Sequence, residues 1–552
     1  MNKKYAFLIG LAITLVAFWF GAPIAIRAYL NEKSGVTVTK VEIVAPLRGG
    51  VLLTGVTVNR GWLKGSFPKV YVWRDTKQVH LQGGSVNIAL SQKPKGAKGD
   101  EKSDGYLVTG EDLEVYATYE ESFATLGGVR FGSQAVVAET VSGYHPRGDF
   151  DAKGVTLTRT GSQVLLDSGE FTPRGQVMGH TLGKVSFQKV TAHLANKTLK
   201  VGSITTSAFG AGLAAAGMKV EQTPEGILGT LESLVVCSKQ LHTDHQGNCL
   251  PTTFKSIEVG PVGLDKLTSS DQRVRIDSAT LHFNLEKRRV WGAETCSAWF
   301  SALPTELKTP ILLGSTYTGS FDFDLELKPE VKLRWNLGCK STVSPAVASL
   351  KDSFQYQVGA NGETSRVSGS KTKDWVPLQE ISPNVITALL TTEDGAFFLH
   401  HGFIREALVS SIAANLKAEK PLRGGSTLTM QLAKNLWLAR SKTLGRKVQE
   451  AFLTIDLESH LSKFQILELY LNVVEFGPDL YGIGPATKKL LDTTPMRLTL
   501  TESLFLTLRL PSPRRAGPLD AAKRSQINRL ITGLATSGKI PEDLATVEMS
   551  TE

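Results

Sequence analysis

The chain has 552 residues, of which 41% are hydrophobic and 21% are charged. This length excludes a single ordinary core and predicts two or three domains, and the composition is that of a folded rather than a disordered protein. The net charge of +10 is typical of proteins that meet nucleic acid, an anionic membrane surface or a phosphate-bearing substrate.

An uncharged apolar run covers residues 5–26 and follows Lys3 and Lys4. About 20 apolar residues suffice to cross a bilayer, so residues 1–30 are predicted to be a cytoplasmic N-terminus and a transmembrane helix. The positive-inside tendency places everything after this single pass outside the cytoplasm. A cleaved signal peptide is the alternative, and it also implies export.

The four cysteines, Cys237, Cys249, Cys296 and Cys339, fall in one central stretch. In an oxidising compartment they are candidates for two disulfides, and the sequence-local option among three connectivities joins Cys237 to Cys249 and Cys296 to Cys339. Zinc binding with His242 and His245 is the weaker interpretation, because no tight C-x-x-C pair is present.

Residues 31–343 carry short alternating runs separated by Gly, Asn and Asp, for example at 51–58, 69–73, 273–277 and 321–327. Period-two alternation predicts a β-rich, mostly antiparallel region. Residues 91–105 have no large apolar side chain and are predicted to be a mobile loop, a candidate boundary between two β subdomains. The Gly-punctuated apolar runs loosely resemble AsmA-like envelope proteins; a plain β-sandwich pair serving as a spacer is the alternative.

A polar stretch at residues 344–374 is predicted to be a linker, and beyond it the pattern becomes helical. Ser382 and Pro383 form an N-cap and an N1 proline. Helices are expected over 383–393, 404–416, 427–438, 444–461, 463–472 and 501–508. We therefore predict an all-α domain at 375–530 and a C-terminal tail at 531–552.

The acidic pair Glu393 and Asp394 follows an apolar helical run, at that helix's negative end. The helix dipole and partial desolvation both favour the protonated carboxyl, which is how a Glu becomes a usable base near neutral pH. The alternative is an exposed acidic pair that only ends a helix.

Two further patterns lie downstream. A Gly-Gly loop runs into a helix capped by Ser426 and Thr427, which exposes backbone N–H groups to a phosphate, although many ordinary helices begin this way. Arg446 and Glu450 are spaced i,i+4, a pattern that usually marks a surface ion pair.

Together, the order and spacing of these patterns resemble the family 51 glycosyltransferases, the peptidoglycan transglycosylases. The motif E-D-x-x-F-x-x-H-x-G is met by Glu393, Asp394, Phe397, His400 and Gly402. The motif G-G-S-T-x-T-x-Q-x-x-K-N is met by Gly424, Gly425, Ser426, Thr427, Thr429, Gln431, Lys434 and Asn435. R-K-x-x-E is met by Arg446, Lys447 and Glu450, and I-L-E-x-Y-L-N with the glycines after it by residues 466–483. Met430 and Lys442 depart from the family pattern, which commonly has Gln and Arg there.

The resemblance implies a lysozyme-like glycosyltransferase domain that polymerises lipid II into β-1,4-linked glycan, with inversion and release of undecaprenyl pyrophosphate. Glu393 would be the base, and Glu450 would orient substrate or a divalent cation, Mg or Mn. Lys434, Arg446 and Lys447 would stabilise the leaving group. The remaining motif residues, from Asp394 to Asn435, would bind substrate, and no organic cofactor is implied. The resemblance also implies a monofunctional enzyme with no transpeptidase domain.

An apolar stripe after the first motif, at Phe403, Ile404, Leu408, Ile412 and Leu416, matches a region that leans into the bilayer in this family. The expected location is the bacterial inner membrane, with the catalytic domain in the periplasm. The expected partners are lipid II, the growing glycan, the membrane and, through the β-rich region, cell-wall synthesis proteins. No nucleic-acid recognition motif is present. The alternatives are a glycan-cleaving hydrolase, and an envelope scaffold or lipid-handling protein with an idle transferase domain.

Overall fold

The computed structural model describes residues 36–45, 50–60, 63–73, 78–89, 107–119, 122–131, 135–145, 148–158, 162–174, 176–177, 180–181, 183–208, 210–244, 246–262, 271–308, 310–327, 330–358, 364–418, 425–438 and 441–542. The predicted membrane span at 5–26 and the predicted mobile loop at 91–105 lie outside these residues. Within the described residues, no helix is both long and apolar enough to cross a bilayer. The chain divides into two compact units, residues 1–236 with 258–264, and residues 237–257 with 265–552.

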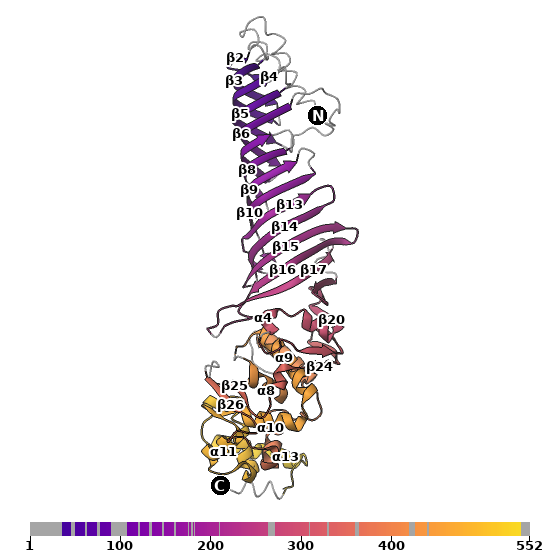
Figure 1. The fold of residues 1–552 in the computed structure, drawn as a ribbon, viewed down its shortest axis with the longest axis vertical. Coiled ribbons are helices and arrows are strands. Elements are labelled where there is room, and N and C mark those ends of the chain that lie inside the picture. Colours follow the sequence, from indigo (N-terminus) through magenta and orange to yellow (C-terminus); the bar gives the residue numbers. More distant parts are fainter. Residues whose placement is uncertain are drawn as a thin grey trace. The chain divides into compact units, whose positions relative to one another are not determined.

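The first unit is a long sheet in which strands follow one another in chain order (Figure 1). Each strand from β2 to β10, and then β13, β14 and β15, pairs with the next. All of these pairings are antiparallel except that of β5 with β6, so the predicted antiparallel β region is confirmed here. The bounds are β1 (Val36–Thr37), β2 (Lys40–Ala45), β3 (Gly50–Arg60), β4 (Leu63–Trp73), β5 (Gln78–Ala89), β6 (Leu107–Tyr119), β7 (Ser122–Phe131), β8 (Ala135–His145), β9 (Gly148–Thr158), β10 (Gln163–Pro173), β11 (Gln176–Val177), β12 (His180–Thr181), β13 (Val185–His193), β14 (Thr198–Ala208), β15 (Ala211–Thr223), β16 (Gly226–Cys237) and β17 (Pro251–Val262).

The predicted boundary between two β subdomains at residues 91–105 is wrong. The strands on either side of it, β5 and β6, are neighbours in the same sheet. Val79 and Leu81 of β5 share one buried cluster with Leu113 and Val115 of β6. Parallel neighbours need a crossover connection longer than a tight turn, which explains a long polar segment here without a domain boundary.

A left-handed glycine changes the alternation within β15. Gly217 has φ of +62°, and an added Cβ would lie 2.3 Å from Cδ of Glu232. The ladder with β14 has no pair at this position, although the register is the same on both sides of it. Leu213, Ala215 and Met218 therefore all reach one face, where they line a mainly apolar cavity of about 300 Å³ with residues of β14, β16 and β17.

The second unit contains a small antiparallel sheet and both disulfides. The sheet pairs β18 (Gln272–Ile276), β19 (Ala279–Asn284), β20 (Arg289–Thr295), β22 (Ser320–Glu326) and β23 (Lys332–Leu337) in that order. Cys237 is bonded to Cys249 and Cys296 to Cys339, the sequence-local pairing. These cysteines are therefore not zinc ligands.

The segment around the second disulfide packs on helix α9 (Leu444–His460). It contains α3 (Cys296–Ser301), α4 (Thr305–Lys308), β21 (Thr316–Thr318) and β24 (Lys340–Val343). The rings of Phe300 and Tyr317 lie 5.3 Å and 5.1 Å, centroid to centroid, from that of Phe452 on α9. Asp456 on the same helix is buried and accepts a 2.8 Å hydrogen bond from Ser344. The helical domain therefore rests on residues that precede it in the sequence.

The described residues of the predicted linker, 344–358 and 364–374, are folded. They contain α5 (Pro345–Ala348) and the hairpin of β25 (Phe354–Val358) with β26 (Thr364–Ser368). Phe354 and Tyr356 are buried in the same cluster as the helices that follow. The segment is polar overall because only alternate residues of β25 face the core.

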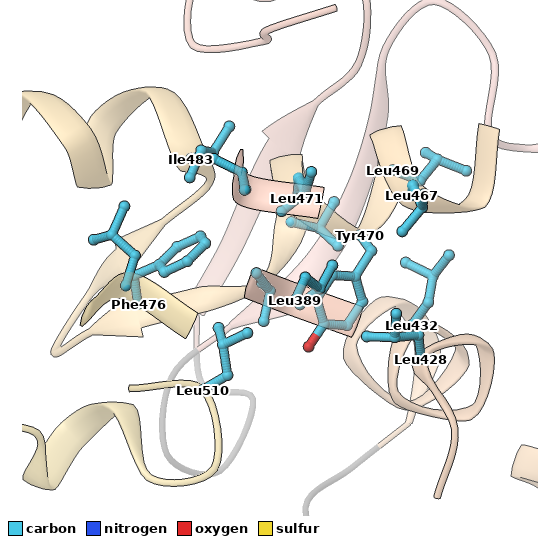
Figure 2. Close-up of a cluster of buried hydrophobic side chains, with 14 of the residues drawn as sticks. Leu389, Leu428, Leu432, Leu467, Leu469, Tyr470, Leu471, Phe476, Ile483 and Leu510 are labelled. Atoms are coloured by element: carbon cyan, nitrogen blue, oxygen red, sulfur yellow. The ribbon is translucent and has the colours of Figure 1, made fainter. Parts of the chain in front are cut away.

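The helical part begins at α6 (Pro383–Thr392) and continues with α7 (Arg405–Ala418), α8 (Leu428–Trp437), α9, α10 (Lys463–Val473), α11 (Ile483–Leu491), α12 (Leu500–Thr507) and α13 (Ala521–Thr536). The six predicted helices are present, with ends shifted by one or two residues. Helices α11 and α13 were not predicted, and the C-terminal tail predicted to start at residue 531 begins inside α13. A short hairpin of β27 (Glu475–Gly477) and β28 (Leu480–Tyr481) means that the domain is mainly, not wholly, α-helical. Its core gathers leucines of α6, α8 and α10 around Tyr470 (Figure 2).

Candidate functional site

Glu393 stands at the C-terminal end of α6. Ser382 caps the start of this helix and also donates a 3.0 Å hydrogen bond to the carbonyl of Leu498, which fixes the helix against the chain before α12. The backbone N–H of Glu393 closes the last turn on the carbonyl of Leu389, at 2.9 Å. Burial raises the pKa of the Glu393 carboxyl, and the charge of Asp394 adds to the rise. The carboxyl therefore has the environment that the sequence predicted for a base.

A short hydrogen-bond relay orients that carboxyl. Gln431 Nε2 donates to Glu393 Oε2 at 2.8 Å, and Tyr470 Oη donates to Gln431 Oε1 at 2.9 Å. Because the Tyr470 hydroxyl occupies the amide oxygen of Gln431, the amide N–H must point at Glu393. Burial raises the pKa of Tyr470 well above its usual range, which keeps the hydroxyl protonated as a donor. Tyr470 was predicted only as a part of the fourth motif, at residues 466–483, and that place was the available signal for its role.

Asp394 makes its hydrogen bonds inside the helical domain. Its side chain is fully buried, and Oδ2 accepts hydrogen bonds of 3.0 Å from the backbone N–H of Leu428, at the start of α8, and from His400 Nε2. His400 Nδ1 accepts from the N–H of Gly402 at 3.0 Å, so the proton of the neutral ring is on Nε2, facing Asp394. Asp394 thus joins the end of α6 to the start of α8.

Other residues of the first two motifs also face inward. Phe397 is 1% exposed. Gly402 has φ of +86°, and a Cβ there would lie 2.5 Å from Thr454. Thr427 caps α8, donates to the carbonyl of Gly402 at 2.6 Å and is 2% exposed. The structure therefore gives Phe397, Gly402 and Thr427, predicted to bind substrate, a role in fixing the segment after α6 against α8 and α9.

The second carboxylate, Glu450, is buried and doubly paired. Its side chain is 1% exposed, with Arg446 Nη1 at 2.6 Å from one oxygen and Lys447 Nζ at 2.6 Å from the other. The prediction of a surface ion pair from the i,i+4 spacing is therefore wrong, because the pair is buried. A carboxylate removed from water needs such compensation, and two cations supply it. The side chain of Lys447 is 44% exposed, so this ammonium can still meet a ligand.

Both carboxylates bond to one short stretch of chain. Gln431 binds Glu393, while Ser426, five residues earlier, lies with Oγ 3.5 Å from Glu450 and accepts from Lys447 at 3.0 Å. Only five positions along the chain separate these two contact points. The two halves of the predicted site are therefore brought together.

The remaining predicted residues surround this stretch. Lys434 lies one turn beyond Gln431 on α8, and its charge lowers the pKa of Glu393 against the effect of burial. Gly425 packs against α7, where a Cβ would lie 2.8 Å from the carbonyl of Ala407. Asn435 is on α8 beside Lys434, and Gly424 lies outside the described residues. The binding roles of Gly425, Ser426, Gln431, Lys434, Asn435, Arg446 and Lys447 stay predictions.

The fourth motif holds the segment that leads into the domain. Glu468 accepts hydrogen bonds from Trp375 Nε1 at 3.2 Å and from the N–H of Leu378 at 2.9 Å. Asn472 makes two 2.8 Å bonds with the backbone of Val376. These two polar residues of α10 therefore anchor the chain before α6.

A metal ion does not fit Glu450 in this arrangement, because each of its oxygens is already bonded to a cationic side chain. The described residues contain no group of three or more His, Cys, Asp or Glu side chains able to hold a metal.

Comparison with known proteins matches the Transglycosylase family to residues 361–533. A biosynthetic peptidoglycan transglycosylase of Nitrosospira multiformis is 38% identical over 172 residues, 30% of this chain and 73% of that protein. One from Chromobacterium violaceum is 41% identical over 140 residues, 25% of this chain and 61% of that protein. A penicillin-binding protein 1A/1B of Bacillus subtilis is 37% identical over 172 residues, 31% of this chain but 19% of that protein.

The matched part of this chain thus spans between about a fifth and three quarters of these relatives. It contains both carboxylates and the residues that bond to them, and it starts after the long sheet and the small disulfide-bearing sheet. The AsmA-like resemblance of the β region stays a prediction. Residues 361–533 match the family in sequence and carry the motifs in an assembled site, and the chain therefore belongs to the transglycosylase family.

Proposed function

We propose that this protein is a peptidoglycan glycosyltransferase that polymerises lipid II into β-1,4-linked glycan and releases undecaprenyl pyrophosphate. The observation that carries the proposal is the pairing of a desolvated carboxyl, Glu393, with a separate cationic group, Arg446 and Lys447, joined through the stretch from Ser426 to Gln431. Inverting transfer needs a base for the incoming hydroxyl and stabilisation of the departing pyrophosphate.

Glu393 is proposed as the base that takes the proton from the 4-hydroxyl of the acceptor sugar. Its raised pKa strengthens it as a base, since a proton acceptor works best when its pKa is close to the working pH. Gln431 directs one carboxylate oxygen by its 2.8 Å hydrogen bond, leaving the other to meet the hydroxyl.

Lys447 and Arg446 are proposed to stabilise the negative charge that develops on the pyrophosphate. Glu450 holds both cations in place and neutralises part of their charge while the site is empty. Lys434 adds a further positive charge on the Glu393 side. Charge-assisted hydrogen bonds to phosphate oxygens are stronger than neutral ones, so this group favours the leaving pyrophosphate over a neutral sugar.

The expected setting is the periplasmic side of the bacterial inner membrane, held by the single span predicted at residues 5–26. Large apolar side chains near the first motif support a membrane contact: Leu399 is 87% exposed, and Phe398 and Phe464 contact each other while remaining exposed. On α7, Leu416 is exposed as well. Cell-wall synthesis proteins are proposed partners of the β region.

A hydrolase is the competing function, because a pair of carboxylates also suits glycan cleavage. The buried contacts of Glu450 with two cations argue against it, since a sugar leaving group needs no cationic group. Purified protein incubated with labelled lipid II, and separately with preformed glycan, distinguishes the two. Lengthening from lipid II supports the proposal, whereas shortening of preformed glycan with no polymerisation contradicts it. An idle domain would give neither product.

A further inference from the structure

The loop between β16 and β17 is closed on itself and belongs to the same compact unit as the helices. The disulfide between Cys237 and Cys249 joins its ends. Inside it, the N–H of Leu241 donates to the carbonyl of Ser238 at 3.0 Å, and Thr243 forms an isolated β-bridge with Cys249. The disulfide therefore encloses a short segment with its own hydrogen bonds, which we call the disulfide loop (residues 237–249).

The disulfide loop bonds to the start of α9. The backbone N–H of Leu444 donates to the carbonyl of Gln240 at 2.8 Å, and that of Gly445 donates to the carbonyl of Leu241, also at 2.8 Å. The first N–H groups of a helix have no partner inside the helix. Here the loop supplies partners for the first two, and its carbonyl dipoles lie at the positive end of α9.

The next two N–H groups of α9 both donate to Thr443. The N–H of Arg446 donates to the side-chain oxygen of Thr443 at 3.3 Å, and the N–H of Lys447 to the carbonyl of Thr443 at 3.2 Å. Arg446 and Lys447 are the cations that hold Glu450. The disulfide loop thus lies against the turn of α9 immediately before Arg446 and Lys447, the cations proposed to stabilise the pyrophosphate.

The contact is close enough to exclude any side chain at position 445. A Cβ on Gly445 would lie 2.6 Å from the carbonyl oxygen of Leu241 and 2.7 Å from Cδ2 of Leu307. Leu307 in turn accepts a 3.0 Å hydrogen bond at its carbonyl from Gln449 on the next turn of α9. The glycine therefore permits a backbone-to-backbone contact that fixes where α9 begins.

We propose that the disulfide loop is a positioning element for the transfer reaction, holding the first turns of α9 so that Arg446, Lys447 and Glu450 stay aligned. This inference rests on the proposed function of those residues. The loop lies outside the part of the chain that matches the transglycosylase family. Because its residues act through α9, opening the loop should lower kcat more than it raises KM.

Two variants of the full-length chain test the proposal by independent routes. The first, Cys237→Ser with Cys249→Ser, opens the loop. The second, Gly445→Ala, keeps the disulfide and pushes the loop from the helix. Gly533→Ala is the matched control, since Gly533 is also helical and an added Cβ there meets nothing within 4 Å. Combining Gly445→Ala with the cysteine changes shows whether the two act on one contact.

Amide hydrogen exchange and lipid II kinetics are measured on each protein. With the loop closed, the N–H of Leu444 should be protected, and opening the loop should remove that protection. We expect kcat to fall roughly 10- to 100-fold in both test variants with KM within about twofold, because misplacing groups by about 1 Å has effects of this size. Gly445→Ala should add little once the loop is open, and Gly533→Ala should match the wild type.

The outcomes separate this inference from the proposed function. An active wild type with unchanged kcat in both test variants overturns the positioning role and leaves the function standing. If Leu444 exchanges equally fast with the loop closed and open, the contact is absent and the inference fails, whatever the activity. A wild type unable to lengthen glycan overturns the proposed function and with it the catalytic purpose of the loop.

Discussion

Replacing Tyr470 with phenylalanine removes one hydroxyl from the relay that orients Glu393. The lost hydrogen bond, 2.9 Å to Gln431 Oε1, is worth about 1 kcal/mol net, and stability should fall by roughly 1–2 kcal/mol. If about 1 kcal/mol of the orientation of Gln431 toward Glu393 is lost as well, kcat falls roughly fivefold. KM should stay unchanged, because neither Tyr470 nor Gln431 is proposed to supply substrate affinity through this relay.

The pH profile gives the sharper readout. The hydrogen bond from Gln431 lowers the pKa of Glu393 and opposes the effect of burial. If Tyr470→Phe loosens Gln431, the pKa of Glu393 rises further, and the rising limb of kcat against pH moves to higher pH. A variant that merely packed less well would not move this limb.

Tyr356→Phe is the matched control, since Tyr356 is also buried and donates to the carbonyl of Val473, at 3.4 Å. Lipid II polymerisation should be followed over pH 5 to 9 for the wild type and both variants. The reasoning is refuted if Tyr470→Phe keeps the wild-type kcat and pH limb, or if Tyr356→Phe changes both in the same way.

Three further predictions follow from buried charges. Burial raises the pKa of Glu393, so the folded chain binds this proton more tightly than the unfolded chain, and stability falls as pH rises from the ordinary carboxyl range to the folded-state value. Glu393→Gln should therefore be more stable than the wild type at pH 7 and equally stable below about pH 4. A melting temperature of the variant at pH 7 that is no higher than that of the wild type would refute this. Burial also raises the pKa of Asp456, although hydrogen bonds from the hydroxyls around it lower that pKa. Asp456→Asn should therefore show the same pH-dependent gain in stability, measured by thermal unfolding, without loss of activity. A loss of stability at pH 7 would contradict this. Arg446→Met leaves the carboxylate of Glu450 half-paired and should cost about 3–5 kcal/mol in urea unfolding, most of it recovered by adding Glu450→Gln. Failure of that recovery would show that the charge is not the cause.

The sequence predicted the helical domain and its motifs well because their signals are local. Ser382 with Pro383 marks the start of α6 by chemistry that acts within one turn. The alternating strands were also recognisable, since the exposure of successive side chains alternates in strands such as β18 and β23. What the sequence did not reveal is which strands meet: the parallel pairing of β5 with β6 joins residues separated by a polar segment that looked like a domain boundary.

The burial of polar groups was the second feature that could not be predicted from the sequence. Arg446 and Glu450 have the spacing of an exposed ion pair, and only the packing of α9 against α8 and the preceding disulfide-bearing segment removes them from water. Tyr470 looked like a core residue because its ring is one (Figure 2), while its hydroxyl reaches Gln431 on another helix. Such roles depend on neighbours distant in sequence, so a local pattern carries no information about them.

The most direct test of the account is the initial rate of glycan lengthening from labelled lipid II by the full-length protein and by Glu393→Gln, with folding checked by circular dichroism. The account predicts steady polymerisation by the wild type and a rate lower by about 10²- to 10⁴-fold in the variant, the usual contribution of a general base. A folded variant that lengthens glycan at a rate near that of the wild type would contradict it.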